Sequence, residues 1–389
     1  MKNNFISLCL CFSLFSVCFL CSCGNSNLKQ AVEYQADGEY VKALVFYKKS
    51  IEAGKDVALC EKNSGDIFFT KGDFQKAFNC YKRSIEKDPN LALDQIIKFI
   101  SYNDKDVRSI AIEMLFKVKN PAAKEKIMAT IATMLKSQKQ HEKIDALEVV
   151  AKFGTLCEPI LNNILVLLDD QNPIIQQKTL SVLPPMASLV IQAGALEKIK
   201  AFLKQDNELV KVNAIECLGD MGRYSMEALP QLIELTDQQE MFKGPAYTAI
   251  RKIGLPSRDQ AAQLVSYLNA DKSFAVRSLV LSIFSQMGPE ANDFMPDILL
   301  LLKDKDHKIA QIARETLMKI GGASEKSVPA LIKLLNEQNT EIRLRAISEL
   351  AAIGPKANSA VESLKKLLQD SNKEVRKYSE NALQKIQQK

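Results

Sequence analysis

The chain has 389 residues, of which 47% are hydrophobic and 25% charged, and its formal net charge at pH 7 is +6. This is the composition of a folded chain. Because tryptophan is absent and aromatic residues make up 7%, an aromatic sugar-binding platform is disfavoured. The basic residues are spread along the sequence, whereas nucleic-acid-binding proteins show a clustered basic face.

Residues 1–22 have the pattern of a secretory signal. Lys2 is the lone charge before an uncharged stretch from Phe5 to Leu20. A helix of that length spans roughly 24 Å, which is short of the roughly 30 Å hydrocarbon core of a bilayer. A basic residue, a short apolar stretch and small residues before a break are typical of a cleaved signal, which is left out of fold reasoning.

The sequence Leu-Cys-Ser-Cys-Gly at residues 20–24 resembles a bacterial lipobox. The resemblance implies that Cys23 is lipidated and becomes the mature N-terminus, with residues 23–27 as a short tether. Each methylene of an acyl chain contributes about 0.8 kcal/mol of membrane affinity. Cys21 stands where lipoboxes usually carry a smaller residue. We therefore expect a lipid-anchored protein of the bacterial cell envelope, and a retained membrane anchor is the alternative.

The cysteines do not form a redox or disulfide framework. Cys18 and Cys21 have redox-like spacing, but they lie inside the apolar stretch, where no folded domain supports them. Buried free thiols are favoured for the four cysteines after residue 23, and a bridge between the first two stays open as an alternative. These four are Cys60, Cys80, Cys157 and Cys217.

Two segments 34 residues apart share one pattern of glycine, alanine, tyrosine and isoleucine. Gly38, Ala43, Tyr47 and Ile51 recur as Gly72, Ala77, Tyr81 and Ile85. Glycine permits a tight turn, alanine a close helix approach, and the aromatic ring fills the gap between helices. With Pro89 after the second copy, the pattern resembles the tetratricopeptide repeat, and two such repeats would cover residues 28–90. Some members of that family clamp a terminal carboxylate with lysine and asparagine. The corresponding residues here are Lys62 and Asp66, and the aspartate would repel a carboxylate.

From about residue 91 the period changes. Helix-ending glycines recur at intervals of 32 to 34 residues where they are consecutive, and second apolar helices carry an early proline. The glycines are Gly154, Gly222, Gly254, Gly288, Gly321 and Gly354, and the prolines are Pro230, Pro296 and Pro329. The pattern resembles HEAT repeats, closest to the short type named after phycobilisome lyases. It implies about nine helical pairs in residues 91–389, ending in a polar C-terminal cap. Because one pair cannot bury its apolar face alone, the pairs stack, and we expect an all-α, right-handed solenoid.

A β-branched residue near the start of each longer helix is often followed by arginine and preceded, five positions earlier, by an acidic residue. The acidic residue is predicted to cap the helix, proline to begin helices and glycine to end them. The HEAT resemblance implies that the arginines pair with acidic turn residues of neighbouring repeats, a structural role rather than a ligand contact. The residues of this expected ladder are Arg108, Arg277, Arg343, Arg376, Asp271, Asp304, Glu337 and Asp370.

Two places break the repeat pattern. Residues 183–188 place two prolines where a helix should finish, and residues 242–247 place Gly244 and Pro245 near the start of another. Proline inside a helix removes a hydrogen bond and clashes with the preceding turn. A hinge or ligand-shaped bend is one interpretation. An early stop and a late start of the two helices is favoured.

No catalytic motif is found. The chain has no phosphate-binding glycine loop, no His-Glu-x-x-His zinc pattern and no serine elbow. Its two histidines do not indicate a site, because His141 opens a helix and His307 is placed in a turn. We therefore expect no catalytic, cofactor or metal site.

Three classes of function are compatible with these patterns. A scaffold that binds a protein partner is favoured, because both repeat families are used in this way. An enzyme that attaches a chromophore is suggested by the phycobilisome-lyase resemblance, but fold alone does not imply function. A nucleic-acid-binding protein is disfavoured by the dispersed charge and the export signal. We expect a non-catalytic, membrane-anchored scaffold without a small-molecule substrate, a cofactor or a nucleic-acid partner.

Overall fold

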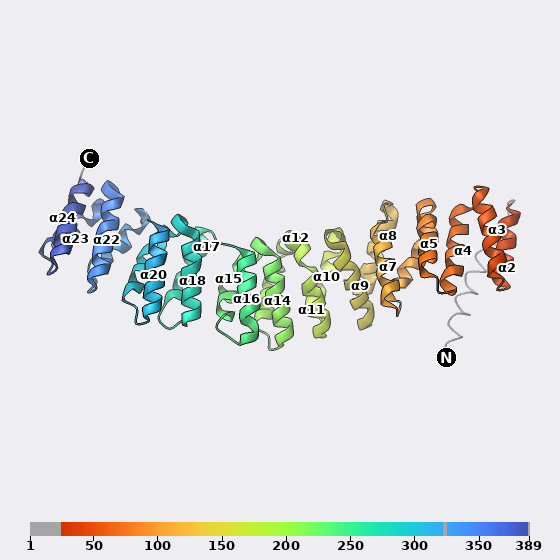
Figure 1. Cartoon of the computed structure of the whole chain (residues 1–389), viewed down its shortest axis with the longest axis horizontal. Helices are drawn as coiled ribbons and strands as arrows, with labels where there is room; N and C mark the ends of the chain where they lie inside the picture. The colour runs from red at the N-terminus through yellow and green to blue at the C-terminus, as the bar shows by residue number, and fades with distance from the viewer. Residues whose placement is uncertain (1–24, 322–324, 388–389) are drawn as a thin grey trace. The chain divides into compact units, whose positions relative to one another are not determined.

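The computed structural model describes residues 25–321 and 325–387, and within these ranges every regular element is a helix. The lipidation candidate Cys23 and the signal at residues 1–22 lie outside the described residues. The chain divides into two compact units between Val182 and Leu183. In each unit consecutive helices pack side by side (Figure 1). The structure thus confirms the expected all-α helical-repeat solenoid.

The first two helical pairs of unit 1 pack around two buried tyrosines. The helices are α2 (Ser26–Ala36), α3 (Tyr40–Glu52), α4 (Val57–Thr70) and α5 (Phe74–Lys87). The Tyr47 hydroxyl donates to Gln35 Oε1 at 2.5 Å, and the Tyr81 hydroxyl donates to Asp66 Oδ1 at 2.9 Å. A Cβ added to Gly65 would lie 2.6 Å from the Tyr81 ring. The ring therefore fills the space beside α4, and no side chain fits at residue 65.

The remainder of unit 1 consists of three further helical pairs. Their helices are α6 (Pro89–Lys98), α7 (Lys105–Phe116), α8 (Pro121–Leu135), α9 (Gln140–Phe153), α10 (Leu161–Val166) and α11 (Pro173–Val182). On α7, Val107, Ala111 and Leu115 recur every four residues and are buried. This spacing places them on one helix face, against the neighbouring helices. The second helices of the pairs contact one another, α7 with α9 and α9 with α11.

One stretch of the described chain, Gln140–Asp169, is apolar and long enough to cross a membrane by length and composition. In the structure it is not a single helix. It turns at Gly154, which has a φ of 53°, and continues as α10. The stretch therefore forms parts of two successive helical pairs of unit 1.

Unit 2 repeats a short helix followed by a longer one, after one additional short helix at its start. Its helices are α12 (Ala187–Gln192), α13 (Leu196–Ala201), α14 (Glu208–Asp220), α15 (Leu229–Leu235), α16 (Glu240–Ile253), α17 (Arg258–Ala262), α18 (Phe274–Met287), α19 (Met295–Leu300), α20 (His307–Ile320), α21 (Val328–Leu334), α22 (Thr340–Ile353), α23 (Val361–Lys366) and α24 (Lys373–Gln387). The longer helices pack in succession, and α14 contacts α16, α18 contacts α20, and α22 contacts α24.

Glycine and proline mark helix ends as the sequence predicted. Five glycines are the C-cap residues of α9, α16, α18, α20 and α22, with φ between 53° and 88°. Residues other than glycine rarely adopt this conformation, so it favours glycine at these ends. Pro230, Pro296 and Pro329 lie in the first turns of α15, α19 and α21, where the missing N–H costs no helical bond.

The predicted capping role of the acidic residues is wrong by two positions. Asp306, not Asp304, is the N-cap of α20, and Asp304 accepts instead from the Asp306 amide at 2.9 Å. Likewise Ser273 caps α18 and Asn339 caps α22. A cap must directly precede the helix to reach its second or third amide. A residue two positions earlier reaches only the turn.

The two irregular segments differ from one another. Helix α11 ends at Val182 before a 3-10 turn at Pro184–Met186, so the early stop is confirmed. The expected late start is wrong, because α16 begins at Glu240 and contains Pro245. Proline removes one backbone hydrogen bond there, and the helix continues to Ile253. The placement of His307 in a turn is also wrong, since it is the first residue of α20.

The four cysteines within the described ranges are free thiols and are buried. No bridge joins Cys60 to Cys80. Burial raises the pKa of the Cys157 thiol to about 12, which keeps it protonated at neutral pH.

Candidate functional site

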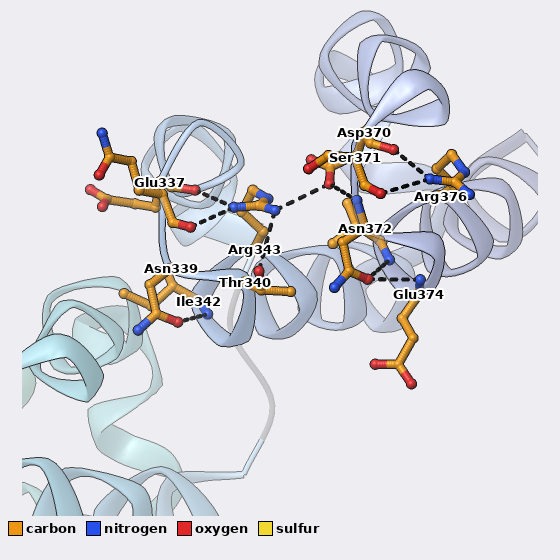
Figure 2. Close-up of polar contacts among 12 residues, drawn as sticks. Glu337, Asn339, Thr340, Ile342, Arg343, Asp370, Ser371, Asn372, Glu374 and Arg376 are labelled. Carbon is orange, nitrogen blue, oxygen red and sulfur yellow. Dashed lines mark hydrogen bonds and ion pairs between the residues drawn. The ribbon is translucent and has the colours of Figure 1, made fainter.

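Arg343 links two turns of unit 2 (Figure 2). Its Nη1 donates to the carbonyl oxygens of Glu337 at 2.7 Å and Gln338 at 2.9 Å, in the turn before its own helix. Its Nη2 donates to Asp370 Oδ1 at 3.1 Å, in the turn before the next long helix. The side chains of Arg343 and Asp370 are each 10% exposed. Because each charge would be costly to bury alone, the contact ties the two repeats together.

Two other arginines bind the turn before their own helix in the same way. Arg376 Nη1 donates to the carbonyl oxygens of Asp370 at 2.7 Å and Ser371 at 3.1 Å (Figure 2). In unit 1, Arg108 Nη1 donates to the carbonyl oxygens of Tyr102 at 2.7 Å and Asn103 at 3.2 Å. Among residues 25–321 and 325–387, neither arginine donates to an acidic turn residue of a following repeat as Arg343 does.

We call a contact between a basic helix residue and the acidic turn residue 27 positions later a rung. Arg277 forms a rung with Asp304 through both of its terminal nitrogens. Burial raises the pKa of Asp304, but hydrogen bonds from Arg277 and the Asp306 amide, with the arginine charge, lower it below its usual value. Lys143 Nζ forms another rung with Asp170 at 2.6 Å. The arginine pattern of the sequence does not indicate this rung, because its basic residue is lysine, although the spacing from the aspartate is the same.

Two of the expected acidic residues do not form rungs with arginine. Asp271 is exposed, and the residue 27 positions before it is Gly244, which has no side chain to donate. The Glu337 carboxylate contacts Lys303 Nζ at 2.6 Å, while its backbone carbonyl accepts from Arg343. A rung therefore requires both a basic helix residue and an acidic turn residue 27 positions later. An acidic turn residue alone does not form one.

A pocket of about 220 Å³ lies on unit 1 between α7 and α9. It combines three cationic and two anionic side chains with a serine and an isoleucine. Its lining residues are Lys105, Arg108, Ser109, Ile112 and Glu113 of α7, and Glu148 and Lys152 of α9. The sequence predicts a structural role for Arg108 but gives no sign of the pocket, because α7 and α9 are separated by α8 in the sequence and lie side by side only in the folded chain.

Glu113 is held on one side of the pocket by two lysines. Its carboxylate oxygens lie 2.9 Å from Lys117 Nζ and 2.8 Å from Lys152 Nζ. Hydrogen bonds from Lys152 and Lys117, together with their charges, lower the pKa of Glu113 to about 2. Glu113 is therefore ionised at neutral pH and occupies both lysines.

The other side of the pocket is less completely paired. Arg108 Nε lies 3.7 Å from Glu148 Oε2, and Lys178 Nζ lies 3.6 Å from Glu148 Oε1. Both distances exceed a hydrogen bond. Arg108 Nε is buried without a hydrogen-bond partner, and Lys105 makes no ion pair within the described part of the chain. The pocket thus presents cationic groups with unused donors.

The other sequence-derived candidates do not form sites. Lys62 Nζ lies 2.7 Å from Asp66 Oδ2, so the lysine of the clamp position is already paired. In residues 25–321 and 325–387, no group of three or more histidine, cysteine or acidic side chains is placed to hold a metal ion.

Comparisons with known proteins agree with the architecture. The family model described as HEAT repeats matches residues 328–389, which include α21 to α24. The fold is therefore an all-α helical-repeat solenoid with HEAT repeats. No curated protein matches the chain.

Among solved structures, the chain is similar to the crystal structure of Kap121p, with 13% identity and a TM-score of 0.47. It is similar to Kap121p bound to Nup53p at 14% identity and the same TM-score. Each alignment covers 89% of this chain and 43% of Kap121p, so this chain spans less than half the length of that protein. At this level the likeness carries no argument about function.

Proposed function

We propose that this protein is a non-catalytic scaffold that binds a protein partner through the exposed surface of its stacked helices. The observation that carries the proposal is the pocket on α7 and α9, where the buried Nε of Arg108 has no hydrogen-bond partner among residues 25–321 and 325–387 and the exposed Lys105 adds a second positive charge. Stacked repeats offer long continuous surfaces on which many side chains of a partner are contacted together.

The proposal includes a place in the cell envelope. The lipobox-like sequence at residues 20–24 supports lipidation of Cys23 and anchoring at a bacterial membrane. It also includes two tetratricopeptide-like repeats at residues 28–90, supported by Tyr47 and Tyr81, which are fully buried in α3 and α5. In this arrangement the repeats begin directly after the short tether of residues 23–27.

Membrane anchoring is tested with Cys23→Ala. The native protein is expected in the membrane fraction with a mature chain that starts at an acylated Cys23, as read by intact mass and N-terminal peptide. The variant is expected to remain unacylated and uncleaved. Unchanged mass and partitioning in the variant would show that Cys23 is not the anchor.

Partner binding is tested by site-specific photo-crosslinking in cells. A photoreactive phenylalanine analogue replaces Ser109, which lines the pocket, or Lys124, an exposed residue of α8 outside the pocket. We expect a discrete crosslinked protein from residue 109 and not from residue 124. Equal crosslinking at both positions, or none at residue 109, would argue against a partner at this face.

A further inference from the structure

The rungs reveal what the Arg108 pocket lacks. In each of three turns, a side-chain oxygen accepts the amide two residues later: Asp170 from Asn172 at 2.9 Å, Asp304 from Asp306 at 2.9 Å, and Asp370 from Asn372 at 2.8 Å. The same bond in the turn before α9 is accepted by Ser137 Oγ, from Lys139 at 3.1 Å. Counted as 17 residues before the helix-ending glycine, Ser137 occupies the turn position of Asp304 in the repeat that follows Arg108, although it lies 29 rather than 27 positions after the arginine.

Arg108 therefore matches the rung arginines at its own turn but forms no rung, because Leu135 stands 27 positions later and Ser137, in the corresponding turn, has no carboxylate. Its Nη1 is bound to two turn carbonyls, as is Nη1 of Arg343. Nη2 of Arg343 continues to Asp370, whereas Nη2 of Arg108 has no hydrogen-bond partner in residues 25–321 and 325–387. The two donors Nε and Nη2 form the edge of a guanidinium that binds a carboxylate through two parallel bonds.

We propose that this pocket binds the carboxylate of an aspartate or glutamate side chain in an extended segment of the protein partner. The proposal rests on the scaffold function proposed above and names the chemistry of its contact. The incoming carboxylate replaces the aspartate that Ser137 does not supply. Lys105 adds a second positive charge at the same pocket.

Glu148 is the group that the ligand displaces. It is shared between Arg108 and Lys178 at 3.7 and 3.6 Å, so neither contact holds it at hydrogen-bonding distance. When a carboxylate binds Arg108, Glu148 retains Lys178 as its partner. The pocket volume of about 220 Å³ accommodates one short acidic side chain, and Ile112 contacts its methylene groups.

The test uses Ile112 as a reporter, because it lines the pocket. The full chain in detergent micelles, labelled at isoleucine methyl groups, is titrated with a capped five-residue peptide that has one central aspartate. We expect the Ile112 methyl resonance to shift with this peptide and not with its asparagine counterpart. A carboxylate could also come from the C-terminus of a partner chain. An asparagine peptide with a free C-terminal carboxylate tests this source, and a shift with that peptide alone would overturn the side-chain assignment.

Ser137→Asp supplies the missing carboxylate within the chain and should weaken peptide binding by about tenfold or more. Ser137→Asn is the matched control of similar size without charge, and it should bind as the native protein does. The other isoleucine resonances report whether each variant is folded. Equal binding by Ser137→Asp, equal shifts with both capped peptides, or no shift at all would overturn the proposal. Crosslinking of a partner at residue 109 with no carboxylate dependence would leave the scaffold function standing without this contact.

Discussion

Arg343 in unit 2 and Arg108 in unit 1 occupy the same position of the repeat but have different surroundings. Both bind the two carbonyl oxygens of the preceding turn, at 2.7 to 3.2 Å. Arg343 then reaches Asp370, and the pair is almost fully buried, whereas the turn before α9 has Ser137 in place of an aspartate and Arg108 lines a pocket between α7 and α9. One repeat motif can therefore hold two repeats together in one unit and leave a cationic site in the other.

Among the variants that test this comparison, Arg343→Ala should have the largest effect on the free energy of unfolding. Arg343→Ala leaves Asp370 buried without its partner and should lower the free energy of unfolding by about 3 to 5 kcal/mol. Arg108→Ala removes the bonds to two turn carbonyls and a long ion pair with Glu148, and should cost about 1 kcal/mol. Urea unfolding followed by far-ultraviolet circular dichroism compares the two variants. Equal losses would show that the two arginines are structurally equivalent.

A second expected effect is on the pH dependence of unit 2. The folded pKa of Asp304 lies below its usual value, so its rung stabilises the fold above the unfolded pKa of about 3.9 and is lost as pH falls through the folded pKa. Asp304→Asn should therefore destabilise the protein at pH 7, and the difference from the native protein should shrink below about pH 4.

Asp271→Asn is the matched control for that experiment, because Asp271 is exposed and has no rung partner. Because it removes a carboxylate outside any rung, its unfolding midpoint at pH 7 should stay close to that of the native protein. A pH-independent difference for Asp304→Asn would mean that the rung does not act through the ionised carboxylate.

The smallest expected effect comes from adding a carboxylate at residue 137, which would complete a rung with Arg108; we call this incomplete contact the open rung. Ser137→Asp should raise the free energy of unfolding by about 0.5 to 1 kcal/mol, because the new pair is partly exposed. The increase should diminish in high salt, which screens partly exposed charges. Thermal melting at low and high salt, with Ser137→Asn as control, measures both quantities. A destabilised Ser137→Asp variant would show that the turn before α9 does not accept a carboxylate.

Much of the fold could be predicted because glycine and proline have strict positional requirements. Gly254 and Gly321 end helices with positive φ, and Pro296 lies in a first turn, as their spacing indicated. The cap residues were misassigned by two positions, since periodicity locates a turn but not the residue whose oxygen reaches the helix amides. The helix containing Pro245 was misjudged for a related reason, because packing outweighs the single hydrogen bond that proline removes.

The pocket could not be predicted for a different reason. A serine in a turn does not by itself indicate a binding site. Ser137 becomes informative only when it is compared with the aspartates at the same turn position of other repeats. Alignment by the glycine at the end of each long helix would have revealed it, since Ser137 and Asp304 both lie 17 residues before such a glycine, Gly154 and Gly321. The pocket also depends on Glu148, which is 40 residues from Arg108 in the sequence and comes within 3.7 Å of its Nε only in the folded chain.

The most direct test of the open rung is a double-mutant cycle between Arg108→Gln and Ser137→Asp, measured by urea unfolding. If Asp at residue 137 reaches the free edge of Arg108, the stabilisation should vanish when Arg108 is absent, with a coupling energy of about 1 kcal/mol. A coupling energy of zero would contradict the account, because Ser137 would then not occupy the place of the missing aspartate.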